Sequence, residues 1–174
     1  MNDGIIKELE TNDIVLVLIS GEEYTHKTVQ VMRELAQLGK KVCYVTLNKP
    51  YETLLKEIDD GSNANDNLHF IDCVGQRDAK NEKNCTYISS PNELSKIDLA
   101  ISNVLKEQKT QLLFFDSLAT LLAYEDGATI VKFAHSIITE LRMRNVKGIF
   151  VNPEGKNAPM AIDLDMFVDK EIKL

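Results

Sequence analysis

The stretch IVLVLISGEEYTHKTVQVM, from Ile14 to Met32, decides the fold class because it joins a strand-like run to a helical pattern. The run Ile14–Ser20 is almost continuously apolar, which is typical of a strand buried on both faces of a parallel sheet. Apolar residues then recur at near-helical spacing over Val29–Leu38, and Gly39 stands where a helix would end. A strand followed by a helix is the repeating unit of an α/β fold.

The same alternation continues along the rest of the chain. Further strands are predicted at Lys41–Leu47, Leu68–Val74, Gln111–Ser117 and Lys147–Val151, and near an edge of the sheet within Met166–Leu174. Helices are predicted at Tyr51–Ile58, from Pro91 to about Lys106, and around Ile130–Leu141. Two polar stretches, Asp59–Asn67 and Gly75–Asn84, are predicted to be the most mobile surface loops. The sequence therefore predicts one α/β domain over residues 1–174, with a mainly parallel central sheet and helices on both faces.

The start of the helix at Pro91 is predicted from local capping signals. Ser90 and Glu93 have the spacing of a capping box, and proline is favoured at the first helical position. We therefore expect this helix to begin directly after Ser90.

Composition limits the function classes. The 174 residues are 44% hydrophobic, which is enough for one buried core. The net charge of -7, with a pI near 5.0, disfavours binding to nucleic acid and to anionic membranes. No apolar run is long enough to cross a bilayer, so we expect a cytosolic protein. The three cysteines are widely spaced and lack a C-x-x-C pair, which favours free thiols over a disulfide framework or a zinc site.

The turn after Ile14–Ser20 has almost the spacing of a phosphate-binding loop. Such a loop holds phosphate through converging backbone N–H groups, the N-terminus of the following helix and a lysine. Here Lys27 would supply the positive charge, while the Thr28 hydroxyl and Asp116, at the end of another buried strand, would hold magnesium. The candidate nucleotide-binding residues are Gly21, Glu22, Glu23, Tyr24, Thr25, His26, Lys27, Thr28 and Asp116.

Three residues of this loop oppose phosphate binding. His26 adds a bulky side chain where a glycine would let the backbone approach a phosphate, and Glu22 and Glu23 would repel one. We expect the loop to be empty of nucleotide, with Lys27 paired to Asp116 or to one of these two glutamates. In a purely structural interpretation, Thr28 caps the helix. Asp116, in the same interpretation, caps the turn that follows its strand.

With both halves of this pattern in view, the chain resembles the RecA superfamily of P-loop ATPases, and especially its KaiC-like branch, which is common in archaea. GEEYTHKT stands at the Walker A position, and LLFFDSLATLL is similar to the Walker B strand and its continuation. AHSIITELRMRNVKGIFV and DMFVDKEIKL resemble the later helix, strand and closing segment of that family. The resemblance implies a RecA-like three-layer sandwich, ATP and magnesium as ligands, and a second copy or a related RecA-like subunit as partner.

One departure from the family pattern concerns catalysis. Where the resemblance implies a glutamate that activates water, this sequence has Asn48 and Lys49. An amide has no useful basicity and an ordinary lysine is protonated, and Glu52 would substitute only if its loop folded back. We therefore expect a RecA/KaiC-like domain with lost or weak ATP hydrolysis that acts in regulation or assembly. The alternatives are a weakly active ATPase and an accessory DNA-recombination paralogue.

His69 and His135 are the other candidates for metal ligands or bases. They are far apart in the sequence and have no partners at metal-ligand spacing, which favours ordinary structural histidines.

Overall fold

The structure, a computed structural model, describes residues 3–59, 66–75, 82–154 and 164–174. Its helices are α1 (Asp3–Thr11), α2 (Tyr24–Gln37), α3 (Tyr51–Ile58), α4 (Leu94–Glu107), α5 (Gly127–Arg144) and the 3-10 helix η2 (Leu118–Ala123). Its strands are β1 (Ile14–Ser20), β2 (Val42–Thr46), β3 (Leu68–Asp72), β4 (Cys85–Tyr87), β5 (Leu112–Asp116), β6 (Lys147–Glu154) and β7 (Lys170–Lys173).

The strands form one sheet with the order β4-β3-β2-β5-β6-β1-β7, and every neighbouring pair is parallel. The predicted α/β class with a parallel central sheet is thus confirmed, and the expected inner strands β1 and β5 each have a neighbour on both sides. The tail strand β7 lies at one edge, as its short alternating pattern predicted. In this register Asp116 at the end of β5 lies level with Thr46 of β2 and Val151 of β6.

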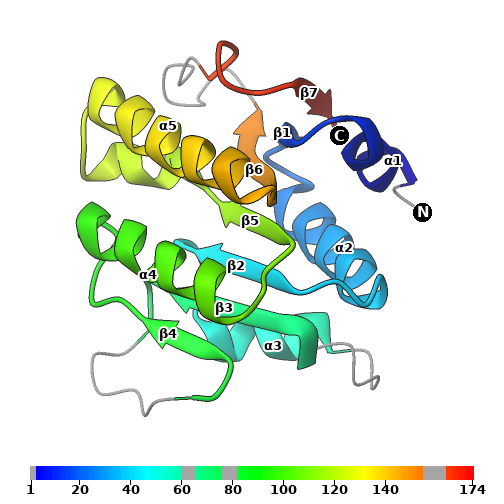
Figure 1. The fold of residues 1–174 in the computed structure, drawn as a ribbon, viewed down its shortest axis with the longest axis horizontal. Coiled ribbons are helices and arrows are strands. Elements are labelled where there is room, and N and C mark those ends of the chain that lie inside the picture. Colours follow the sequence, from blue (N-terminus) through cyan, green and yellow to red (C-terminus); the bar gives the residue numbers. More distant parts are fainter. Residues whose placement is uncertain (1–2, 60–65, 76–81, 155–163) are drawn as a thin grey trace.

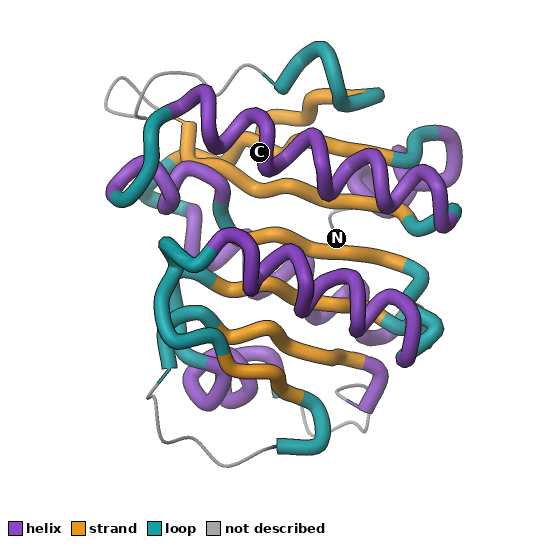
Figure 2. The backbone as a smooth tube through the Cα atoms, turned by 60° about the vertical axis from the view of Figure 1, so that its left-hand side comes forward, coloured by secondary structure: helices purple, strands orange, loops and turns teal. Residues whose placement is uncertain are grey.

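Helices cover both faces of the sheet, which gives three layers (Figure 1, Figure 2). Alternate residues of β1 point to opposite faces, so that Leu16 packs with α4 and α5 whereas Val17 packs with α1, α2 and α3. The buried apolar residues of the sheet and helices therefore form two clusters, one on each face of the sheet. The carboxyl ends of the strands lie along one edge of the sheet, and the helices and loops next to that edge line the candidate site.

Three elements were not predicted, namely α1, β4 and the 3-10 helix η2. Helix α1 packs Ile5 and Leu9, one turn apart, against the sheet. Strand β4, which pairs with the edge of β3, has only the residues Cys85–Tyr87. A three-residue strand is too short to show a period in the sequence.

The predicted start of α4 at Pro91 is wrong. The helix begins at Leu94, and the backbone N–H of Glu93 donates to the Ser90 carbonyl, so Ser90–Glu93 forms a turn before it. Serine at the first position and proline at the second also favour a β-turn, and here this preference prevails over the capping box. The predicted loops Asp59–Asn67 and Gly75–Asn84 lie largely outside the described residues.

Candidate functional site

The candidate site is a pocket of about 430 Å³ at the carboxyl ends of β1, β2, β5 and β6. In open parallel sheets this edge is where ligands usually bind. The pocket is lined by Gly21, Tyr24, Thr25, Thr28, Val29, Tyr44, Asn48, Lys49, Leu54, Asp116, Ser117, Ala119, Thr120 and Pro153.

Helix α2 reaches further toward β1 than the sequence suggested. Only Gly21, Glu22 and Glu23 separate the two elements, and Tyr24 is already helical. The loop predicted over Gly21–Thr28 is therefore shorter than expected.

A buried carboxylate stands at the base of the pocket. Asp116, at the end of β5, is 4% exposed and accepts hydrogen bonds from three side chains of other segments. Its Oδ1 accepts from the Tyr24 hydroxyl at 2.6 Å and from Asn48 Nδ2 at 2.7 Å, and its Oδ2 accepts from the Tyr44 hydroxyl at 2.8 Å. The carboxylate thus ties α2, β2 and the loop after β2 to β5.

The electrostatics follow from this burial. Removal from water raises the pKa of Asp116 above the ordinary aspartate value, although the bonds from Tyr24, Tyr44 and Asn48, and the charge of Lys49, oppose the rise. Burial and the neighbouring carboxylate also raise the pKa values of both tyrosines, which remain neutral hydrogen-bond donors.

The loop after β2 is held by a polar chain and an ion pair. Asn48 Oδ1 accepts from Thr120 Oγ1 at 2.5 Å, and Thr120 Oγ1 lies 2.9 Å from Ser117 Oγ. The Lys49 ammonium contacts both carboxylate oxygens of Glu57 at 2.7 Å. The lysine that lines the pocket is therefore already paired.

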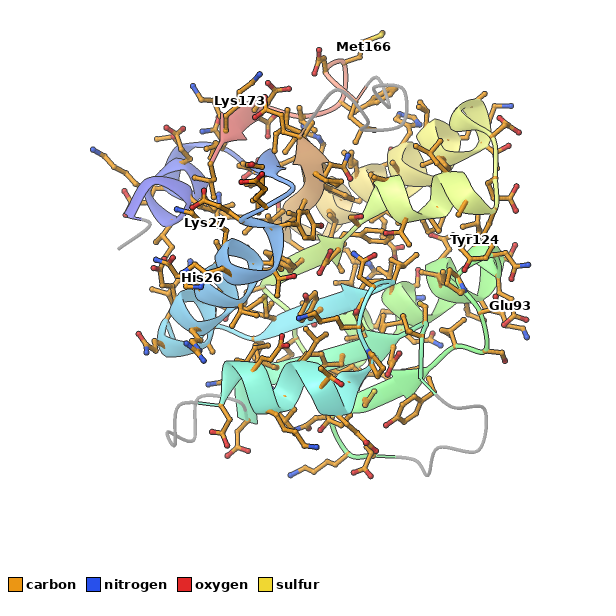
Figure 3. The ribbon with its side chains drawn as sticks, turned by 180° about the vertical axis from the view of Figure 1, so that it is seen from behind. His26, Lys27, Glu93, Tyr124, Met166 and Lys173 are labelled. Carbon is orange, nitrogen blue, oxygen red and sulfur yellow. The ribbon has the colours of Figure 1, made fainter. Side chains whose placement is uncertain are left out.

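The structure brings some of the predicted site residues together and separates others. Gly21, Tyr24, Thr25, Thr28 and Asp116 all line the pocket. Glu22, Glu23, His26 and Lys27 are not among its lining residues. Figure 3 shows His26 and Lys27 on the flank of α2 that faces away from β2, and the His26 side chain is exposed. The histidine is therefore not the group that fills this site.

The expected pairing of Lys27 is wrong. The two carboxylate oxygens of Asp116 are occupied by Tyr24, Tyr44 and Asn48, and no ion pair joins Lys27 to Asp116, Glu22 or Glu23, all of which the structure describes. Lys27 lies on α2 and is not among the residues that line the pocket.

Both structural interpretations of Thr28 and Asp116 are also wrong. Residue Glu23, not Thr28, is the N-cap of α2, and Thr28 lies inside the helix. The Thr28 hydroxyl oxygen is buried without a hydrogen-bond partner among the described residues. The Asp116 carboxylate binds side chains of other segments and does not cap the turn after its own strand.

Sequence reasoning missed several lining residues. Tyr44 is the most informative of these, because a tyrosine in the middle of the buried strand β2 needs a hydrogen-bond partner for its hydroxyl. That signal pointed to a polar group near β2. The small and apolar lining residues Ala119, Pro153 and Leu54 gave no such signal, because their sequence patterns are those of ordinary core and turn residues.

Other candidate ligands lie outside the pocket. His69 Nε2 lies 3.0 Å from Thr86 Oγ1, and the His135 ring packs on Phe167. Within the described ranges, no three histidine, cysteine, aspartate or glutamate side chains are arranged to hold a metal ion. The described helices also include none that is long and apolar enough to span a bilayer.

Comparison with known proteins supports the fold. Among solved structures, a KaiC-like protein from the hyperthermophilic archaeon Pyrococcus horikoshii OT3 superposes with a TM-score of 0.67 at 17% sequence identity, covering 93% of this chain and 70% of that one. This similarity establishes a RecA-like fold. Among curated proteins, none is significantly similar in sequence. Residues 15–174 match the family of unknown function DUF7504, and the chain belongs to that family.

Proposed function

We propose that this protein is a RecA/KaiC-like domain that has lost efficient ATP hydrolysis and acts as a regulatory or assembly protein. The observation that carries the proposal is the hydrogen bond from the Tyr24 hydroxyl to Asp116. The resemblance to P-loop ATPases assigns this aspartate to magnesium, and here its oxygens are used by the protein itself. A metal ion or its water would have to compete with three neutral donors for a buried carboxylate.

The phosphate side of the site supports the same conclusion. The segment Gly21–Glu23 is short and carries two carboxylates, and Lys27 is not among the residues that line the pocket. A triphosphate in the pocket would meet Asp116 without an unpaired lysine to offset the repulsion, because Lys49 is held by Glu57.

The position of Asn48 argues against hydrolysis. Its side chain bonds Asp116 and Thr120 within the site, where the resemblance implies a catalytic glutamate. An amide cannot take a proton from water. Glu52, the alternative base considered from the sequence, is exposed on α3 and does not line the pocket. ATP and magnesium are therefore not required for the proposed role.

A titration with magnesium ATP and magnesium ADP tests the proposal. We expect no saturable binding by calorimetry and no phosphate release above that of buffer. Lys27→Ala should leave both measurements unchanged, because Lys27 is outside the pocket. Saturable ATP binding with steady turnover, abolished by Lys27→Ala, would instead establish the ATPase alternative.

An assembly role implies a partner, and a second copy or a related RecA-like subunit is the partner that the fold suggests by analogy. We expect light scattering over a range of protein concentrations to detect association, either of the protein alone or after mixing with such a subunit. A strictly monomeric protein in both experiments would contradict the assembly role while leaving the loss of ATP hydrolysis untouched.

A further inference from the structure

The pocket at the sheet edge has mainly apolar walls. Its apolar lining residues are Val29, Leu54, Ala119 and Pro153, and the rings of Tyr24 and Tyr44 add aromatic surface. Its volume of about 430 Å³ lies within the range of about 300–1,000 Å³ that is usual for small-molecule sites. An apolar cleft of this size with a few polar groups is suited to a small organic molecule.

One polar group in the pocket lacks a partner. Thr28 is 3% exposed, and among the described residues nothing forms a hydrogen bond with its hydroxyl. A threonine inside a helix commonly donates to the carbonyl four residues earlier, which would be that of Tyr24. Here this bond is not formed, and Thr28 lines the pocket. A buried hydroxyl without a partner is unfavourable, so a ligand that bonded it would remove that cost.

The charges around the pocket select against an ionic ligand. Asp116 has both carboxylate oxygens occupied by neutral donors, and the Lys49 ammonium is paired with both oxygens of Glu57. An anion would meet the buried carboxylate without an available lysine. A cation would have to compete with the three donors of Asp116 and would face the positive end of α2. An uncharged ligand avoids both costs.

The available polar groups are hydrogen-bond donors. The pocket includes Tyr24 and Thr25 at the start of α2, where backbone N–H groups have no acceptor within the helix, and the N-cap Glu23 makes no side-chain hydrogen bond to them. Together with the hydroxyl of Thr28, these groups suit an oxygen acceptor. We infer that the pocket binds a small uncharged ligand of mostly apolar surface that presents a carbonyl or amide oxygen to Thr28 Oγ1.

This inference rests on the proposed function in one respect, since both require that the pocket does not hold a triphosphate. The two are tested separately. Saturable ATP binding with steady turnover would overturn the proposed function. Failure of uncharged probes to bind, with no ATP binding either, would overturn only the inference about the ligand.

Three probes of similar shape test the ligand chemistry: benzamide, benzoate and benzylamine. We expect benzamide to shift the backbone amide NMR signals of Tyr24, Thr28 and Asn48 in a saturable way, and the two ions to bind at least about tenfold more weakly. Equal binding of benzoate, or no binding of benzamide, would overturn the inference.

Thr28→Val tests the role of the hydroxyl with little change in shape. We expect it to weaken benzamide binding by about five- to tenfold, the equivalent of one hydrogen bond, and at the same time to raise the midpoint of thermal unfolding. A hydroxyl with a purely structural role would not give these opposite effects. Thr139→Val is the matched control on α5, where the hydroxyl is exposed and donates to the His135 carbonyl; it should leave benzamide binding unchanged.

A second variant keeps the test decisive if Thr28→Val folds poorly. Ala119→Leu places a larger side chain at the pocket wall, on the half-buried surface of η2. We expect it to abolish benzamide binding while the protein remains folded by circular dichroism. Unchanged affinity in this variant would show that benzamide binds elsewhere and would overturn the assignment of the site.

Discussion

The hydroxyl of Tyr24, in the first turn of α2, donates a hydrogen bond of 2.6 Å to Oδ1 of Asp116 at the end of β5. The two residues are 92 positions apart in the sequence. Their contact joins the segment that resembles a phosphate loop directly to the carboxylate that resembles a magnesium ligand. Each group provides a hydrogen-bond partner for the other, and this pairing determines what the site is able to bind.

Tyr24→Phe tests how much this bond contributes. The variant removes one donor from a buried carboxylate, so we expect the free energy of unfolding to fall by about 1–3 kcal/mol. Chemical denaturation monitored by circular dichroism measures the change. Tyr124→Phe is the control, because Tyr124 is half exposed and is not one of the three side chains that donate to Asp116; its effect should be close to zero. Equal effects of the two variants would show that the bond to Asp116 has no special role.

Asp116→Asn tests the electrostatics of the pocket through pH. The pKa of Asp116 is raised in the folded protein, mainly by burial, so the folded state binds a proton more tightly than the unfolded chain. The contribution of Asp116 to stability is therefore fully present below the unfolded pKa of about 3.9 and falls as pH rises from there through the folded pKa. We expect the free energy of unfolding of Asp116→Asn, relative to the unmodified protein, to rise over the same pH range. A difference that is constant with pH would contradict this account.

The opposite pH dependence is expected at Asp169, which fastens the segment before β7. Partial burial alone would raise its pKa, but Arg142 and the backbone N–H groups of Ile14 and Asp13 lower the pKa below the ordinary aspartate value. This stabilisation is present above the unfolded pKa and is lost as pH falls through the folded pKa. Asp169→Asn should therefore be less stable than the unmodified protein near neutral pH, and the difference should shrink in acid.

Urea denaturation at a series of pH values measures that difference for Asp169→Asn. Asp165→Asn is the control, because Asp165 is exposed nearby. If the two variants changed stability equally at every pH, the contacts of Asp169 would have no part in holding β7 against β1.

His26→Gly tests whether the histidine keeps nucleotide out. The imidazole is exposed and does not line the pocket, so we expect no gain in ATP binding. Glycine should instead lower the free energy of unfolding by well under 1 kcal/mol, because it weakens the first turn of α2. His26→Ala should have a small effect of opposite sign. A marked gain in ATP affinity by His26→Gly alone would show that the side chain does block a nucleotide.

Much of the fold could be predicted because burial leaves a direct trace in the sequence. The continuous apolar runs of β1 and β5 required burial on both faces, which only inner strands of a covered parallel sheet provide. The stripe at Ile130, Phe133 and Ile137 required one buried helix face and appears as α5. Such patterns are local and repeat with the period of the element, so they can be read without knowledge of contacts.

Boundaries were less predictable, since the same residues favour more than one local structure. Pro91 suits either a first helical turn or a β-turn. In the structure it lies in the turn Ser90–Glu93, before α4 begins. At Tyr24 the helix begins early because its ring packs beside the inner face of the sheet and its hydroxyl finds Asp116. Neither contact is visible within a short window of sequence.

The sequence by itself determined the α/β class, the buried strands and the polar residues available at their ends. Only the tertiary structure decided which of these residues meet. Asp116 accepts hydrogen bonds from Tyr24, Tyr44 and Asn48, which are 92, 72 and 68 residues away in the sequence. Lys27, by contrast, is only three positions from Tyr24 on the same helix and lies outside the pocket. The physical reason is that secondary structure follows the local pattern of burial, but the partner of a buried polar group depends on how strands distant in sequence are placed side by side.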